Sequence, residues 1–257
     1  MKIVSWNVNS IRARVEIVRD FLTRVRPDVL AMQETKVADH EFPTEEFTRL
    51  GYAVAFTGQR TYNGVAIASR LPMSDVCVGL FDDGADAERR LIAATIAGVR
   101  VMSAYVPNGK AVDLPSFRDK LRWLERLRIT LDTRSEPDAP IALCGDFNVA
   151  REDRDVHAPE RLRGRLLFHP DEHKALSHLL EFGLFDSLRE RDGSPRLYSW
   201  WDYRGGDFRE NRGLRIDYVF VTAPLRARLR DAGIDAEPRK LDKPSDHAPV
   251  WVEIEDA

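Results

Sequence analysis

Short apolar segments recur along the chain, separated by polar or turn-forming residues. Runs of about four to eight such residues, bounded by Gly, Pro, Asn or Asp, are typical of β-strands. On this pattern we predict strands at residues 2–6, 28–32, 52–57, 64–69, 91–97, 99–106, 141–147, 215–222 and 250–254.

Three of the intervening segments carry apolar residues every three or four positions, which is the spacing of one helix face. The first predicted helix covers 11–25 and stops before Pro27, and the second covers 115–131. The third includes Leu176 and is closed by Gly183, a residue type that often follows the end of a helix.

Two pairs of predicted strands follow each other without an intervening helix. These are 52–57 with 64–69, and 91–97 with 99–106, the latter joined by a turn at Gly98. Hairpins of this kind argue against a purely parallel, doubly wound sheet. We therefore predict an α/β fold in which two β-sheets pack together and the helices lie outside.

The composition fits an intracellular protein. Its 257 residues could form one large domain or two small ones, and we see no linker between domains. Cys77 and Cys144 lack the spacing of a metal site; Cys144 ends an apolar run, and we interpret it as a small buried residue in a reducing cytoplasm. No signal peptide is evident, and no run approaches the roughly 18 apolar residues that span a bilayer. We expect a soluble cytoplasmic protein without membrane contact.

The formal net charge of −3 argues against a surface that binds polyanions everywhere, but the arginines cluster locally. In 151–165, five arginines are offset by acidic residues, so a solvated loop is as good an interpretation as a binding site. In 196–215, five arginines alternate with Tyr198, Trp200, Trp201, Tyr203 and Phe208. Cations beside stacking surfaces suit a nucleic acid better than a plain loop.

Polar residues stand beside predicted strands in four tracts: 5–9, 32–36, 143–148 and 243–250. The strongest is at Asp146, because the preceding strand is wholly apolar and Gly145 lets the backbone pass close to a neighbour. A buried carboxylate must be paired, hydrogen-bonded or metal-bound, so we predict a chemical role for Asp146. Glu34 taken alone is interpreted as a helix-capping or surface residue.

Asp217 interrupts the predicted strand 215–222 with a charge and therefore needs a partner. His247 is the obvious candidate. A single histidine is more often structural than catalytic, but Pro244 and Pro249 restrict the loop that carries this one. We predict a hydrogen-bonded pair of acid and imidazole.

These residue types suit a Mg²⁺-dependent hydrolysis of a phosphodiester, with no catalytic Cys or Ser. Such a reaction needs an activated water, neutralisation of the phosphate and help for the leaving oxygen. Mg²⁺ takes oxygen ligands, whereas a zinc site would need several His or Cys. Only His169 and His173 among the six histidines are four positions apart, and we give that pair little weight.

Six motifs, taken together, resemble the exonuclease III family of apurinic/apyrimidinic endonucleases, within the wider endonuclease/exonuclease/phosphatase superfamily. They are SWNVNSIRA at 5–13, QETK at 33–36, YVPNG at 105–109, GDFN at 145–148, GLRIDY at 213–218 and SDHAPV at 245–250. GDFN and SDH mark only the superfamily, which includes DNase I and inositol phosphatases. QETK, GLRID and the SWWDY of 199–203 indicate the exonuclease III branch.

The resemblance runs from residue 1 to about 253 and implies one domain, 1–257, built as a four-layer αββα sandwich of two mixed sheets flanked by helices, as in DNase I. It implies a metal site formed by Glu34, Asn9 and Asp246, binding Mg²⁺ or Mn²⁺. Asp146 would activate the attacking water or protonate the leaving group, helped by Asn148 and Asn7.

For the remaining residues, the resemblance implies that His247, oriented by Asp217, donates to the scissile phosphate. Tyr105 would bind the phosphate or support the leaving oxygen. Trp200 and Leu214 would wall the pocket for the base-free sugar. Contacts with DNA would come from Lys36, Asn108 and Arg212.

The function implied is a monomeric DNA repair hydrolase that cuts 5′ to abasic sites in double-stranded DNA and leaves a 3′-hydroxyl. It would also trim blocked 3′ ends and degrade duplex DNA from 3′ to 5′. One alternative is a phosphodiesterase or phosphatase for lipid or inositol phosphates, although a small headgroup needs no stacking platform. Another is a non-catalytic nucleic-acid-binding relative, which would require the loss of catalytic positions that are all present here.

Overall fold

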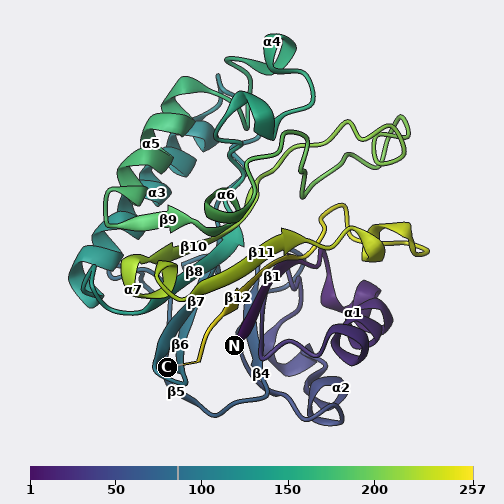
Figure 1. The fold of residues 1–257 in the computed structure, drawn as a ribbon, viewed down its shortest axis with the longest axis vertical. Helices are drawn as coiled ribbons and strands as arrows, with labels where there is room; N and C mark the ends of the chain where they lie inside the picture. Colours follow the sequence, from purple (N-terminus) through teal and green to yellow (C-terminus); the bar gives the residue numbers. More distant parts are fainter. Residues whose placement is uncertain (86, 257) are drawn as a thin grey trace.

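The computed structural model describes residues 1–85 and 87–256, in which two six-stranded sheets lie against each other (Figure 1). The first sheet has the order β11-β12-β1-β2-β4-β3. Its strands are β1 (Lys2–Asn7), β2 (Val29–Gln33), β3 (Ala53–Thr57), β4 (Val65–Ser69), β11 (Leu229–Ile234) and β12 (Val250–Ile254).

The second sheet has the order β5-β6-β7-β8-β10-β9. Its strands are β5 (Met73–Val78), β6 (Leu91–Ile96), β7 (Val99–Tyr105), β8 (Ile141–Asp146), β9 (Leu184–Asp186) and β10 (Asp217–Thr222). Both sheets are mixed, because β1 runs parallel to β2 and β7 parallel to β8, whereas their other strand pairs are antiparallel.

Helices and short turns lie between the strands along the chain. The α-helices are α1 (Ile11–Val25), α2 (Thr44–Thr48), α3 (Pro115–Arg134), α4 (Pro159–Leu162), α5 (Pro170–Leu180), α6 (Ser187–Arg191) and α7 (Ala223–Arg226). Short 3-10 turns are η1 (Asp39–Glu41), η2 (Asp153–Asp155) and η3 (Glu237–Lys240). No helix in the described residues is both long and apolar enough to cross a membrane.

Three apolar clusters separate four layers. The central cluster lies between the sheets and includes Ile67 and Val252 from one sheet and Val101 and Val219 from the other. A second cluster packs α1 and α2 on the outer face of the first sheet. A third packs α3 and α5 on the outer face of the second sheet. The predicted α/β sandwich with helices outside is therefore confirmed.

All nine predicted strands and the three predicted helices are present, with shifts at their ends. The helix predicted at 115–131 extends to Arg134, and the strand predicted at 215–222 begins at Asp217. Gly98 forms the predicted turn, with φ of 77° after Ala97 at 46°, as two-residue hairpins require. The arginine-rich stretch 151–165, which could be a solvated loop, contains η2 and α4.

Candidate active site

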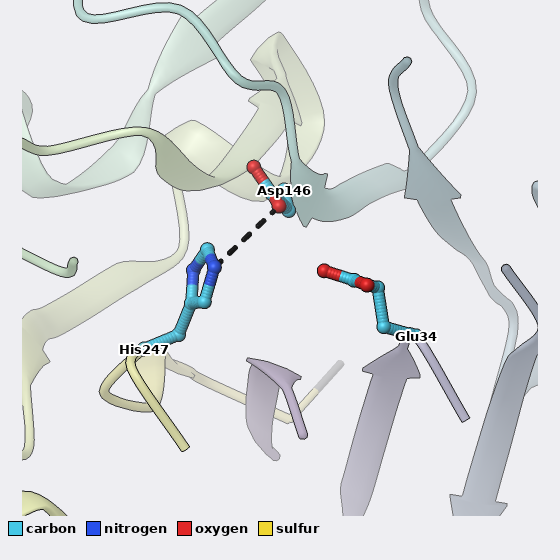
Figure 2. A group of neighbouring side chains, drawn as sticks. All are labelled: Glu34, Asp146 and His247. Atoms are coloured by element: carbon cyan, nitrogen blue, oxygen red, sulfur yellow. Dashed lines mark ion pairs between the residues drawn. The ribbon is translucent and has the colours of Figure 1, made fainter. Parts of the chain in front are cut away.

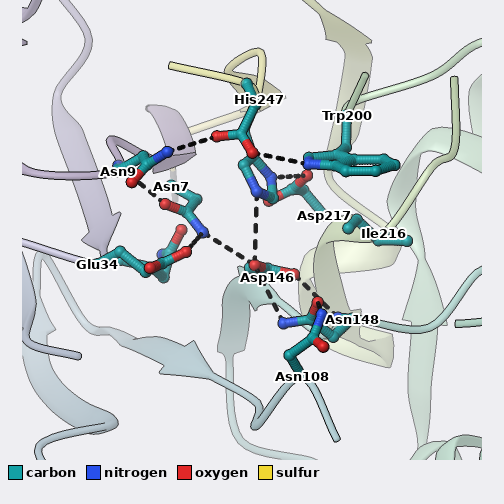
Figure 3. Close-up of polar contacts among 12 residues, drawn as sticks. Asn7, Asn9, Glu34, Asn108, Asp146, Asn148, Trp200, Ile216, Asp217 and His247 are labelled. Atoms are coloured by element: carbon teal, nitrogen blue, oxygen red, sulfur yellow. Dashed lines mark hydrogen bonds and ion pairs between the residues drawn. The ribbon is translucent and has the colours of Figure 1, made fainter. Parts of the chain in front are cut away.

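The candidate site lies at one edge of the paired sheets because of how the central strands run. The parallel strands β1 and β2 both end there, with Asn7 opposite Gln33. The parallel strands β7 and β8 end at the same edge, and the antiparallel β10 begins there, with Asp217 opposite Asp146. The ends of β1, β2, β7 and β8 and the start of β10 therefore meet at this edge. They bring together polar side chains from segments that are distant along the chain (Figure 3).

Gly145 makes the close approach on which the position of Asp146 depends. A Cβ atom at residue 145 would lie 2.1 Å from the carbonyl oxygen of Ala104 in the neighbouring strand. Any larger residue would push β8 away from β7 and displace the carboxylate that follows. The prediction that the backbone passes close to a neighbour at Gly145 is confirmed.

Asp146 is almost completely buried and is held by amide donors. Asn7 Nδ2 donates to Asp146 Oδ2 at 2.9 Å and to Glu34 Oε1 at 2.8 Å, so one side chain links the two carboxylates. The backbone N–H of Asn148 donates to Asp146 Oδ1 at 2.9 Å. Asn108 Nδ2 in turn donates to Asn148 Oδ1 at 2.9 Å. These contacts fix the carboxylate without neutralising it.

His247 and Asp217 form the predicted pair. His247 Nδ1 lies 2.9 Å from Asp217 Oδ2, and both side chains are buried. His247 Nε2 lies 3.7 Å from Asp146 Oδ2 (Figure 2). Ser199 Oγ donates to Asp217 at 2.6 Å, so the carboxylate is held from both sides. The imidazole therefore bridges two carboxylates, one on each ring nitrogen.

The charges in this group shift one another's pKa values. Burial raises the pKa of Asp146 and the nearby carboxylates of Asp217 and Glu34 raise it further, to about 7, although His247 opposes the change. Burial alone would lower the pKa of His247, but Asp217 and Asp146 outweigh it and raise the value to about 10. At neutral pH we therefore expect an imidazolium beside a carboxylate that can exchange a proton.

We expect the ring of His247 to keep its proton up to about pH 10 in the metal-free protein. Because the pKa in the folded state is raised above its ordinary 6.5, the associated stability is fully present below pH 6.5 and is lost as the pH rises through 10. Histidine NMR shifts, recorded from pH 5 to 11 with EDTA, measure this. A ring that deprotonates between pH 6 and 7 would contradict the expectation.

Three residues of the site have a strained backbone conformation. Glu34, Asn9 and Asn148 have left-handed φ values of 51°, 44° and 52°. Conformations of this kind cost about 1–3 kcal/mol each for residues other than glycine and persist where the surroundings impose them. The N–H of Ser10 donates to Glu34 O at 2.7 Å and helps to fix this turn. Strain concentrated at one edge is typical of a functional site.

The donor set fits a hard divalent cation. Glu34, Asp146 and His247 offer ligand atoms that all lie within 4.8 Å of one another. Because Asp217 and Asp146 raise the pKa of His247, we expect its imidazole to hold a proton at neutral pH, so the oxygens of the two carboxylates are the expected ligands. Two close acidic groups with amide donors around them suit Mg²⁺ or Mn²⁺ better than Zn²⁺.

The other residues assigned to the metal lie beside this cluster. Asn9 Nδ2 donates to Asp246 Oδ1 at 2.9 Å. Burial alone would raise the pKa of Asp246, but His247 and the hydrogen bonds from Trp200 and Asn9 lower it. Asp246 therefore stays ionised and adds a further negative charge to the site, beside Glu34, Asp146 and Asp217.

Lys36, which the resemblance assigns to DNA contact, forms an ion pair with Glu34, the residue assigned to the metal. Its Nζ lies 2.8 Å from Glu34 Oε2. Both side chains are only partly exposed. Lys36 thus offsets the charge of Glu34 at the rim of the site, and a cation bound by Glu34 would share that carboxylate with it.

The two residues assigned to the sugar pocket are adjacent. The backbones of Trp200 and Leu214 exchange two hydrogen bonds of 2.9 Å. Trp200 is half-buried, and its Nε1 donates to Asp246 Oδ2 at 2.9 Å. Leu214 is buried in a small apolar cluster with Val156, Phe168 and others, so most of its side chain faces the protein interior.

Tyr105 lies at the end of β7 beside two carboxylates. Burial raises its pKa well above the ordinary value, and Glu34 and Asp146 raise it further, so its hydroxyl remains protonated. The guanidinium of Arg90 lies 4.7 Å from the centre of the Tyr105 ring and opposes this shift. Tyr105 is therefore available as a hydrogen-bond donor.

Arg212 is not brought to the cluster. Its Nε donates to Asp207 Oδ1 at 2.9 Å and its Nη2 to Gly205 O at 2.6 Å, within the loop between Tyr203 and Gly213. The charge is thus partly compensated inside the loop, and Arg212 shapes that loop in the structure.

The interpretation of 196–215 as one exposed tract of cations and stacking rings is wrong in part. Tyr198 and Trp201 are buried, and Arg215 is 1% exposed. The guanidinium of Arg215 pairs with Asp155 at 2.8 Å and Asp186 at 2.7 Å, in the interior. Its guanidinium also lies 4.5 Å from the centre of the Tyr218 ring, so this arginine belongs to a buried ion network and is not available to a nucleic acid.

Two residues that contribute to the site were not predicted. Ser199 orients Asp217, and the small polar residue before two tryptophans was its only signal. Ser245 donates through Oγ to Asn7 O at 2.7 Å and accepts the N–H of His247, which fixes the turn that carries this histidine. The contacts of Ser199 with Asp217 and of Ser245 with Asn7 join residues distant along the chain, so local sequence does not predict them.

Comparisons with known proteins agree with this geometry over the full length. A profile described as the Endonuclease/Exonuclease/phosphatase family matches residues 4–247. Exodeoxyribonuclease III of Haemophilus influenzae is 35% identical, over 99% of this chain and 100% of that protein.

Two solved structures are also similar to this chain over almost its whole length. An AP endonuclease from Archaeoglobus fulgidus is 42% identical with a TM-score of 0.95, covering 99% of both chains. The 3′ phosphatase NExo from Neisseria, solved with a product DNA hairpin, is 40% identical with a TM-score of 0.95 and the same coverage. The four-layer arrangement is therefore the one that these proteins share.

Proposed function

Because this chain belongs to the endonuclease/exonuclease/phosphatase family, we propose that it is a DNA repair nuclease of the exodeoxyribonuclease III type. It cuts the phosphodiester 5′ to abasic sites, leaves a 3′-hydroxyl, trims blocked 3′ ends and degrades duplex DNA from 3′ to 5′. The observation that carries the proposal is the cluster of Asn7, Glu34, Asp146, Asp217 and His247 at one sheet edge, in a chain similar to such nucleases from end to end.

Asp146 is the residue of this cluster best suited to proton transfer. A carboxylate with a pKa of about 7 can accept a proton from water or return one to a leaving oxygen near neutral pH. Asn7 and Asn148 hold its two oxygens in place during either event. Both roles use the same geometry, and they differ only in the direction in which the proton moves.

His247 and Tyr105 supply hydrogen bonds to the phosphate. The imidazolium of His247 can donate from Nε2 while Asp217 holds Nδ1. Tyr105, at the end of β7, keeps its phenolic proton and can donate a second hydrogen bond. Fixed donors of this kind stabilise the charge that develops on the phosphoryl oxygens.

We assign Mg²⁺ to Glu34 with Asn9 and Asp246 nearby, and Mn²⁺ could replace it. A divalent cation bound there would neutralise phosphate charge and polarise the reacting bond. Lys36 and Asn108 border the same edge and would contact the DNA backbone. The protein would act as a monomer of one domain, in the cytoplasm and at the nucleoid.

The alternative substrate class, lipid or inositol phosphates, is not favoured. The relatives and structures that match over the whole chain carry nuclease or DNA repair names. The half-buried ring of Trp200 beside Asp246 also offers a flat apolar surface next to the charged site, which suits a sugar or base more than a soluble headgroup.

Removing the metal is expected to abolish incision. Glu34→Ala, or excess EDTA with the native protein, should lower the rate on abasic duplex DNA by about 100-fold or more, because metal neutralisation of the phosphate supplies several kcal/mol. Glu41→Ala is the matched control, since that partly exposed acid pairs with Arg12 at the surface, away from the cluster. Rates in EDTA equal to those in Mg²⁺ would refute the metal role.

Trp200 is expected to act in lesion recognition. An abasic nucleotide leaves the stack at lower cost than an intact one, and an apolar wall would hold its bare sugar. Trp200→Ala should therefore reduce abasic-site kcat/KM far more than it reduces melting temperature. Trp200→Phe keeps an aromatic ring but loses the hydrogen bond to Asp246. Comparing it with Trp200→Ala distinguishes the contribution of the ring to the pocket from that of the hydrogen bond to Asp246.

Trp201 provides the control for this test, because it is buried and its Nε1 donates to Asn211. Trp201→Ala should destabilise the protein by about 3–5 kcal/mol, as loss of a core aromatic does. A folded Trp200→Ala protein with normal melting and unchanged kcat/KM would rule out the pocket role.

A further inference from the structure

An ammonium group is buried directly beneath the candidate site. Lys120 lies in α3, and its side chain is fully buried. Its Nζ donates to Asn148 O at 2.6 Å, to Asn108 O at 3.3 Å and to the carboxylate of Glu172 in α5. An ammonium has three N–H donors, and here each has an acceptor.

This ion pair is not explained by stability alone. Taking both charges out of water is costly, and a well-packed apolar pair of similar size is often as stable or more stable. The α3–α5 contact has ample apolar packing without it, from Leu124, Leu127, Leu176 and Leu179 among others. A buried charge in such a place calls for a role in arranging specific polar groups.

The groups that Lys120 arranges are two backbone turns of the site. It holds the carbonyl oxygens of Asn108 and Asn148, whose side chains bond to each other at 2.9 Å. Asn148 has a left-handed backbone, and its N–H donates to Asp146. Glu172 also accepts the N–H of His169, so the same carboxylate fixes the start of α5.

We propose that Lys120 and Glu172 are positioning residues, which hold the turns of Asn108 and Asn148 so that Asn148 orients Asp146 for the reaction. The pair does not touch substrate and acts through backbone carbonyls. This role rests on the proposed nuclease function. Its effect falls on kcat, because the orientation of Asp146 matters to the chemical step and the pair lies below the DNA-facing edge.

The double variant Lys120→Met/Glu172→Met tests the role without leaving an unpaired buried charge. We expect a folded protein with a moderately lower melting temperature, because both charges leave together but the carbonyl oxygens of Asn108 and Asn148 and the N–H of His169 lose a partner. On an abasic duplex kcat should fall by about 10- to 100-fold, with little change in KM, as small displacements of catalytic groups produce. The N–H of Asn148 should exchange faster with solvent in NMR, measured in EDTA without DNA.

Leu127→Ala is the matched control, since Leu127 is buried on the same helix but contacts no site residue through a hydrogen bond. It should lower the melting temperature while kcat at 25 °C and exchange of the Asn148 N–H stay at native values. Native kcat and native exchange in the double variant would overturn the proposal.

Glu172→Gln provides the second variant if the double one does not fold, because it keeps the shape of the side chain and removes only the charge. Faster exchange and lower kcat in it support the role, and native values for both overturn it. If the native protein does not cut abasic DNA, the proposed function fails, whereas the exchange measurement still decides the positioning role.

Discussion

Asp146→Asn is expected to lower kcat on abasic duplex DNA by about 10²- to 10⁴-fold, the usual worth of a proton-transfer group. The variant keeps the size of the side chain but removes its negative charge and its capacity to hold a proton near pH 7. Single-turnover incision measures the effect on the chemical step, and an anisotropy assay with Ca²⁺ in place of Mg²⁺ measures DNA binding separately.

The same substitution has a structural cost that must be measured beside the rate. Both oxygens of Asp146 accept N–H donors, one from Asn148 and one from Asn7. An amide offers a single acceptor oxygen, so one donor would face the new NH₂ group, at a cost of about 1–3 kcal/mol. Melting should show a folded protein at the assay temperature. Near-normal turnover in that folded variant would remove Asp146 from the mechanism.

Asp217→Asn and His247→Asn are expected to act as one unit. Each should reduce kcat by about 100-fold or more, since loss of the carboxylate lowers the pKa of His247 and loss of the ring removes the donor. The double variant should be little slower than the worse single one. Rates for all four proteins complete the cycle, and fully additive losses would mean that the residues do not couple.

Ser199→Ala is the graded control for that cycle. It removes the hydroxyl that donates to the Asp217 carboxylate and accepts the N–H groups of Ile216 and Asp217, but it leaves the carboxylate and the ring in place. We expect a smaller loss of kcat than in either single variant and a small fall in the pKa of His247, read from the same NMR titration.

The sequence could predict the strands that are buried on both faces, because such strands are continuous apolar runs. β2, β4 and β8 are wholly buried and were all predicted. β5 was not predicted, since it forms the exposed edge of its sheet and alternates polar and apolar residues irregularly across a bulge. β9 has only three residues, and β11 carries exposed Arg230 and Asp231.

Within the site, the pairing of Asp217 with His247 followed from a charge that interrupts an apolar strand. The same logic applied to Arg215, two residues earlier, but the arginines and aromatic residues around it suggested a nucleic-acid-binding tract instead. Its partners Asp155 and Asp186 come from a loop and a short strand that no local pattern joins to β10.

The sequence contains a sign that Lys120 is buried, which our predictions did not use. It lies on the apolar face of α3, three residues after Phe117 and four before Leu124. A lysine at such a position either extends its charge to solvent or has a buried partner. Only the packing of α5 against α3 shows that the partner is Glu172, so the sequence alone could mark the position but not the contact.

The most direct test of the proposed nuclease function is one incision assay on a duplex with a single tetrahydrofuran abasic analogue, incubated with Mg²⁺. We expect one cut immediately 5′ to the lesion and an upstream fragment that a DNA polymerase extends without further processing, because its end is a 3′-hydroxyl. An uncut duplex, under conditions in which the same protein releases phosphate from an inositol phosphate, would contradict it.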